Sequence, residues 1–179
     1  SSQPVGNKSA GDWGGIILLG RARINTASGA DTAAIEGISP AVYFGGNNDA
    51  DNSGVMRYCR IEYSGVALSP NNEINGLTMG GVGSGTVIEY IQVSWNGDDS
   101  FEWFGGTVNC KYLVSYIPVD DEFDTDFGFR GKVQFGLGIR KPAVADISGS
   151  THFESDNNNG PNFNTPRTQP IFTNMTSIG

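Results

Sequence analysis

Hydrophobic and polar positions alternate along several short segments of the chain, which is the pattern of half-buried β-strands. Three such segments resemble one another and end on an aromatic residue: 55–63, 87–95 and 107–116. The second segment follows the first by 32 residues, and it matches the third at an offset of 21. No stretch of ten or more residues combines a helical period with capping residues. The pattern therefore predicts an all-β chain built from repeated strands.

The alignment of the three segments assigns one inward face to all of them. If the alternation is strict, four columns of like residues point into a common core. These columns are Val55/Val87/Val108, Cys59/Ile91/Tyr112, Ile61/Val93/Val114 and Tyr63/Trp95/Tyr116.

A second repeat follows the strands and is acidic. The phrase Asp-Asp-x-Phe-acid occurs at 98–102 and again at 120–124, and a weaker version occupies 150–154. Repeats of this length, built from short strands, are typical of a parallel β-helix, in which a single coil cannot bury its own apolar face. A β-sandwich does not have to repeat at one coil length, and a propeller blade needs about 40 residues or more.

We therefore predict a single-stranded, right-handed parallel β-helix of about five to six coils, with the hand following the usual rule for parallel crossovers. It forms a single domain over residues 1–179. Residues 170–179 have the pattern of another strand, and neither end carries a recognisable polar cap. The domain is accordingly expected to be truncated at both ends, as one section of a longer solenoid.

Charge and cysteine content limit the partners of the chain. The net charge of −8 argues against a nucleic-acid backbone as partner and permits cation binding or simple solubility. No apolar run is long enough to predict a membrane span in this segment. Cys59 aligns with Ile91 and Cys110 with Glu89, two coils apart, so we expect two free thiols.

Several phrases of the sequence resemble a known family. They are GDWGGIILLG (11–20), SGVMRYCRIEYSG (53–65), SPNNEINGLTMGGVGSGT (69–86), NGDDSFEWFGGTVN (96–109) and FESDNN (153–158). Together they resemble the secreted right-handed β-helix proteins of Bacteroidota and related marine bacteria, which are often lipoproteins or carry a type IX secretion sorting domain. The resemblance implies the fold, an extracellular or outer cell-surface location and a place within a larger polypeptide. It implies no reaction.

The acidic repeat predicts a cation site. Phe101, Phe123 and, less regularly, Ile74 and Phe153 should form an inward column, so that the neighbouring carboxylates stack outward on adjacent coils about 4.8 Å apart. Like charges at that spacing repel by about 1 kcal/mol per pair in water, and a bound cation would relieve this. Hard oxygen ligands suit Ca²⁺, but a solvated acidic edge without a cation is the commoner arrangement, and a catalytic role for the carboxylates is a third alternative. The candidate ligands are Asp98, Asp99, Glu102, Asp120, Asp121 and Asp124.

Two classes of function remain open. The first is a non-catalytic module for adhesion or for contact with a polysaccharide or another cell-surface component, with Trp103 as a candidate sugar-stacking residue. The second is a Ca²⁺-dependent, polysaccharide-active enzyme of the uronate-lyase type, in which Lys132 or Arg140 removes the proton beside the uronate carboxyl. Basic residues next to acidic ones are usually ordinary surface pairs, and the single histidine, His152, argues against a multi-histidine metal site. We therefore favour the non-catalytic module.

Overall fold

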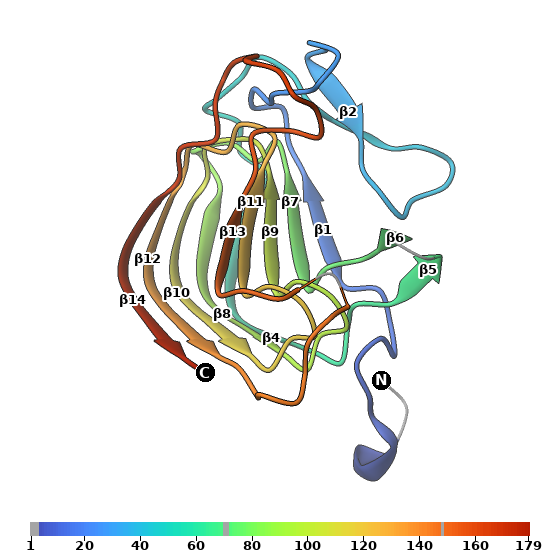
Figure 1. The fold of residues 1–179 in the computed structure, drawn as a ribbon. Helices are drawn as coiled ribbons and strands as arrows, with labels where there is room; N and C mark the ends of the chain where they lie inside the picture. Colours follow the sequence, from blue (N-terminus) through green and yellow to red (C-terminus); the bar gives the residue numbers. More distant parts are fainter. Residues whose placement is uncertain (1–3, 70–71, 148) are drawn as a thin grey trace.

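The structure is a computed structural model that describes residues 4–69, 72–147 and 149–179. Residues 1–3, 70–71 and 148 of the predicted domain lie outside the described residues. The chain winds into a solenoid of short strands, with two sheets running side by side along its length (Figure 1). The predicted all-β, right-handed parallel β-helix is confirmed. Within the described residues, the only helical element is the 3₁₀ turn η1 (Val5–Asn7), which is far too short to cross a membrane.

Each coil contributes one strand to each of two parallel sheets, and five strands in each sheet make five coils. The short sheet contains β1 (Ile16–Leu19), β7 (Leu77–Gly80), β9 (Phe101–Phe104), β11 (Phe123–Asp126) and β13 (Phe153–Ser155). The long sheet contains β4 (Val55–Glu62), β8 (Val87–Ser94), β10 (Asn109–Tyr116), β12 (Lys132–Ile139) and β14 (Ile171–Ile178). Two small antiparallel pairs lie outside this frame. They are β2 (Thr32–Ala34) with β3 (Tyr43–Gly45), and β5 (Ala67–Ser69) with β6 (Asn72–Glu73).

The main core lies between the two sheets. Phe123 stacks on Phe101 at 5.7 Å and on Phe153 at 5.5 Å between ring centroids, so the predicted inward aromatic column exists. Its next member is Leu77, which pairs with Phe101, and the expectation of Ile74 at this point is wrong. Residues 74–76 lie between β6 and β7, outside either strand, so Ile74 is not part of the column.

A second, smaller core lies on the outer face of the short sheet. Ile24, Ile35 and Phe44 come from the segment that precedes the second coil, and they pack against Phe104 of β9. This segment therefore covers part of a sheet face that would otherwise meet water. Loops on the same face also bury several of the acidic residues.

The strict alternation predicted for the long strands is wrong. Each long strand contains a residue with positive φ near its middle: Tyr58, Tyr90, Tyr112, Phe135 and Asn174. This left-handed residue drops out of the ladder pairing on both paired strands, so the register between strands is kept, but two consecutive side chains point outward before the alternation resumes. Met56, Cys59 and Ile61 consequently face the core, whereas Val55 is 67% exposed.

The predicted alignment of the second and third segments is one residue out of register. Asn109 pairs with Val87, so the offset between β8 and β10 is one residue more than predicted. Leu113 takes the place expected for Tyr112, and Ser115 takes the place expected for Val114. Cys110 pairs with Ile88 and not with Glu89 as predicted, but it still lies in a different column from Cys59, and both thiols are free as expected.

Candidate functional site

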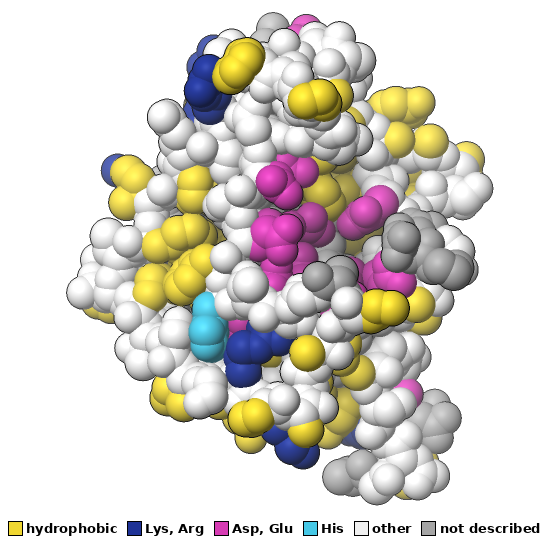
Figure 2. All heavy atoms as spheres, in the orientation of Figure 1, with side chains coloured by type: hydrophobic (Ala, Val, Ile, Leu, Met, Phe, Trp, Pro, Cys, Tyr) yellow, Lys and Arg dark blue, Asp and Glu magenta, His cyan; other side chains and the backbone are white. Residues whose placement is uncertain are grey.

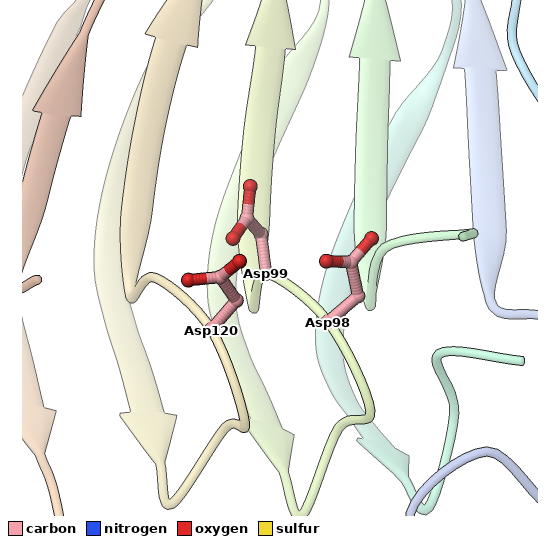
Figure 3. A group of neighbouring side chains, drawn as sticks. All are labelled: Asp98, Asp99 and Asp120. Atoms are coloured by element: carbon pink, nitrogen blue, oxygen red, sulfur yellow. The ribbon is translucent and has the colours of Figure 1, made fainter. Parts of the chain in front are cut away.

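The two acidic phrases form equivalent turns on neighbouring coils. Each leads into a strand of the short sheet, and β9 pairs with β11 so that Glu102 lies beside Asp124. Gly97 permits the close packing of the first turn, because a Cβ there would lie 2.3 Å from the carbonyl oxygen of Gly65. Figure 3 shows Asp98, Asp99 and Asp120 pointing toward a common space from these turns.

Five of the six predicted carboxylates converge. Two groups each have carboxylate oxygens within 4.8 Å of one another: Asp98 with Asp99 and Asp120, and Asp99 with Glu102 and Asp124. Asp99 belongs to both groups. Asp121, the sixth, belongs to neither, and its Oδ1 accepts a hydrogen bond from the backbone NH of Thr151 on the next coil. Among the described residues, Asp121 is the one candidate ligand that is not grouped with the others.

Asp98, Asp99, Glu102 and Asp120 line a pocket of about 660 Å³. We call this pocket, together with Asp124 beside Glu102 on the paired strand, the acidic pocket. Asp99 and Glu102 are only 8% and 7% exposed, so the expectation that the acidic column points into open water is wrong. Loops outside the repeat cover it and bring Glu36 and Glu73 to its wall. The sequence repeat contains no signal for these two residues. Figure 2 shows the Asp and Glu side chains of this region gathered in one patch.

Several buried oxygen atoms in the acidic pocket lack a hydrogen-bond donor. Asn75 is 1% exposed and donates through Nδ2 to Glu102, which leaves its Oδ1 without a partner in the described structure. Asp120 Oδ1 and Asp124 Oδ1 are also buried and have no hydrogen-bond partner in the described structure. Each such atom costs free energy comparable to a lost hydrogen bond. A cation among these oxygens would satisfy them.

Burial and mutual repulsion raise the pKa values of the pocket carboxyls. Burial is the larger cause at each of them, with repulsion from neighbouring carboxylates adding to it. The pKa of Asp98 and of Asp124 rises to about 7 and that of Asp120 to about 6, while the pKa values of Asp99 and Glu102 rise well above their usual range. Without a cation, the acidic pocket therefore retains protons near neutral pH.

The two candidate bases are not placed for catalysis in the acidic pocket. Arg140 Nη1 donates to Glu122 Oε2 at 2.8 Å and to the backbone carbonyls of Asp120 and Thr151, so it holds turns together. Lys132 begins β12 and Arg140 follows its end, which separates them by roughly 26 Å of extended strand. The expectation that Lys132 lies beside the acidic residues is thus wrong. The two ends of a long strand lie on opposite edges of the solenoid, and the acidic turns are near the other end of β12.

Glu122, Arg140 and His152 form a separate buried cluster. Glu122 is fully buried, and its Oε2 also lies 3.3 Å from His152 Nδ1. Burial raises the pKa of Glu122 to about 7 in spite of Arg140, and burial together with Arg140 lowers the pKa of His152. The ion pair between Arg140 and Glu122 connects the turn after β12 to the acidic turn before β11.

Trp103 is a core residue and not a surface for sugars. It is 0% exposed, and its ring stacks on Phe129 at 5.3 Å between centroids. The alternation along β9 places Phe101 and Trp103 inward and Glu102 outward, which excludes the predicted contact between Trp103 and substrate.

A continuous row of exposed aromatic residues lies instead on the outer face of the long sheet. Tyr58, Tyr90, Tyr112 and Phe135 stack in order with centroid separations of 4.6, 4.4 and 5.0 Å. They line a groove of about 570 Å³ together with Arg60, Gln92 and Asn174, and we call it the aromatic groove. The left-handed residues of β4, β8, β10 and β12 supply the rings, so the alignment that placed Tyr112 inward missed this surface. The recurrence of an aromatic residue at one position in successive strands is the signal that could have revealed it.

Comparison with known proteins gives one family. A family model described as a pectate-lyase like β-helix domain matches residues 2–179. Neither the curated proteins nor the solved structures include a significant match to the chain.

Proposed function

Because the chain belongs to the pectate-lyase-like β-helix domain family, we propose that it is a non-catalytic extracellular or cell-surface module that contacts a polysaccharide and is stabilised by Ca²⁺. The observation that carries this proposal is the aromatic groove. The extracellular location is supported by the family, whose domains are commonly extracellular. Export as a lipoprotein or through type IX secretion, within a larger polypeptide, stays a prediction from the sequence resemblance.

The aromatic groove suits a linear glycan. It crosses successive strands of the long sheet, which repeat about every 4.8 Å, so one type of contact recurs along its length. Tyr90 and Tyr112 are each 39% exposed and offer ring edges and hydroxyl groups, while Gln92 and Asn174 offer amides. A sugar has both apolar C–H faces and hydroxyl groups, and this mixture of aromatic and polar groups matches it.

The acidic pocket supports the Ca²⁺ part of the proposal. Its donors are carboxylates and an amide carbonyl, which are the ligands that Ca²⁺ prefers. The unpaired oxygens of Asn75, Asp120 and Asp124 are groups that a cation would satisfy. Ca²⁺ bound there would join two neighbouring coils and remove the repulsion between their carboxylates.

The lyase alternative is less well supported. Such an enzyme needs a base close to the cation and the substrate, but Arg140 is bound to Glu122 and backbone carbonyls, and Lys132 lies at the other edge of the solenoid. Neither residue faces the acidic pocket. The arrangement therefore favours binding over catalysis.

Affinity electrophoresis through gels that contain plant, algal or bacterial polysaccharides tests the binding function. We expect at least one polysaccharide to retard the wild-type protein, and Tyr90→Ala and Tyr112→Ala to weaken this binding about tenfold or more. Tyr43→Ala is the matched control, since Tyr43 is 61% exposed but lies outside the groove. Equal binding by all three variants would assign the glycan to another surface.

The same polysaccharides test the enzyme alternative. A lyase produces an unsaturated sugar that absorbs in the near ultraviolet, so incubation with acidic polysaccharides and Ca²⁺ should leave the absorbance unchanged. Turnover that disappears in Lys132→Ala or Arg140→Ala would overturn the non-catalytic assignment.

A further inference from the structure

We infer that the acidic pocket binds two divalent cations that share Asp99 as a bridging ligand. This inference rests on the proposed stabilisation by Ca²⁺ and specifies how the same pocket achieves it. Asp98 and Asp120 complete the first subsite, and Glu102 and Asp124 complete the second.

The positions of the carboxylates define the two subsites. In each group of three, one oxygen from every residue lies within 4.8 Å of the others, which is the separation of ligands around a single ion with bonds of about 2.3–2.6 Å. Only Asp99 is common to both groups. The ligands of the first subsite come from the turns, and Glu102 and Asp124 come from the paired strands β9 and β11, so the two subsites lie at successive levels of the pocket.

Asn75 gives an independent indication of a ligand at the second subsite. This residue is 1% exposed and lines the acidic pocket, and its Oδ1 has no hydrogen-bond partner in the described structure. Its Nδ2 donates to Glu102 Oε2, which fixes the amide so that the carbonyl oxygen remains available. An amide carbonyl held in this way is a neutral Ca²⁺ ligand.

The charge of the pocket favours two ions over one. The five carboxylates carry a formal charge of −5 when ionised, so one divalent cation leaves −3 and two leave −1. Glu36 and Glu73 at the wall add further negative charge. A second cation therefore enters a pocket that remains strongly negative after the first.

Asp99 is held in place for the bridging role before any ion binds. Its Oδ1 accepts a hydrogen bond from the backbone NH of Asp121 at 2.8 Å, and its carbonyl accepts one from Asn96 Nδ2 at 2.6 Å. Asn96 in turn accepts a hydrogen bond from the Ser64 hydroxyl at 2.5 Å. These bonds orient the carboxylate without occupying Oδ2.

Isothermal titration of the chelator-treated chain with Ca²⁺ tests the inference. We expect two ions per chain for the wild type, one for Asp98→Ala and one for Asp124→Ala. Asp99→Ala should weaken both binding events about tenfold or more, because it removes the shared ligand. Asp31→Asn is the control, since Asp31 is exposed and does not line the pocket. Circular dichroism in chelator checks that every variant is folded.

The outcomes separate this inference from the proposed function. A single ion in the wild type, lost in all three pocket variants alike, would overturn the two-ion site and leave stabilisation by Ca²⁺ standing. Two ions that persist in Asp99→Ala with unchanged affinity would overturn the bridging role. Absence of any Ca²⁺ binding would overturn both this inference and the Ca²⁺ part of the proposed function.

Discussion

At the scale of single residues, the behaviour of the acidic pocket depends on burial more than on charge density. The stacked carboxylates would repel by only about 1 kcal/mol per pair in water. Once the covering loops bury them, desolvation becomes the main cause of their raised pKa values, and repulsion adds to it. A repeat that appears in the sequence as a charged surface thus becomes a group of residues that needs either protons or a cation.

Replacing Asp124 by Asn should separate the two effects. We expect the variant to stabilise the metal-free protein slightly, because it removes a buried carboxyl that repels its neighbours. It should also weaken the stabilisation by Ca²⁺, because it removes a charged ligand. Melting temperatures with Ca²⁺ and with chelator measure both, with Asp31→Asn as the control. An unchanged response to Ca²⁺ in Asp124→Asn would remove this residue from the cation site.

The two thiols should differ in reactivity. Cys110 is 1% exposed, and burial raises the pKa of its thiol to about 12, so very little reactive thiolate is present. Cys59 is only partly buried. Brief treatment of the native protein with iodoacetamide should therefore modify Cys59 first, as peptide mass spectrometry would show. Modification of Cys110 at the same rate would mean that the core opens readily.

At the scale of the element, the long strands are defined by their left-handed residues. A non-glycine residue in this conformation costs roughly 1–2 kcal/mol, yet Tyr58, Tyr90, Tyr112 and Phe135 all adopt it. The compensation lies in the stack of rings, whose members are 4.4–5.0 Å apart and repeat with the coil. Asn174 occupies the same position in β14 without an aromatic ring, and Asn tolerates this conformation better than most residues.

The backbone requirement at this position can be tested apart from the ring. Tyr112→Asn and Tyr112→Val both remove the stack, but the β-branched valine is poorly suited to a positive φ. We expect Tyr112→Val to lower the free energy of unfolding by about 1–2 kcal/mol more than Tyr112→Asn does. Urea denaturation measures the difference. Equal stabilities would mean that the strand can straighten at this point.

At the scale of the whole molecule, the two sheets carry different surfaces. The outer face of the short sheet is covered by loops and holds the acidic pocket, whereas the outer face of the long sheet is open and carries the aromatic groove. A cation in the pocket would link the third and fourth coils, to which β9 and β11 belong. Under the proposed function, the cation-stabilised region and the glycan-binding surface lie on separate faces.

The pH dependence of stability follows from the pocket. In chelator, the folded pKa values of about 7 for Asp98 and Asp124 exceed the value of about 3.9 for an unfolded Asp, so the folded state binds more protons. The stabilising contribution of these groups is fully present below about pH 4 and is lost as the pH rises through 6 to 7. Ca²⁺ should restore stability at the higher pH, by about 2.7 kcal/mol at a hundred times its Kd. Urea unfolding at several pH values tests this, and a metal-free stability that rises from pH 5 to pH 7 would contradict it.

The sequence by itself determined the coil and the identity of the stacked residues. A parallel solenoid places like residues at the same point of each turn, so its structural repeat is visible as a sequence repeat. The sequence therefore paired Phe101 with Phe123 and Glu102 with Asp124 directly. Only the tertiary structure decided which side chains of the long strands face the core, because one left-handed residue in each strand shifts the alternation without changing the composition. It also decided that the acidic column is buried, since the loops that bring Glu36 and Glu73 lie outside the repeat and their placement depends on packing between distant segments.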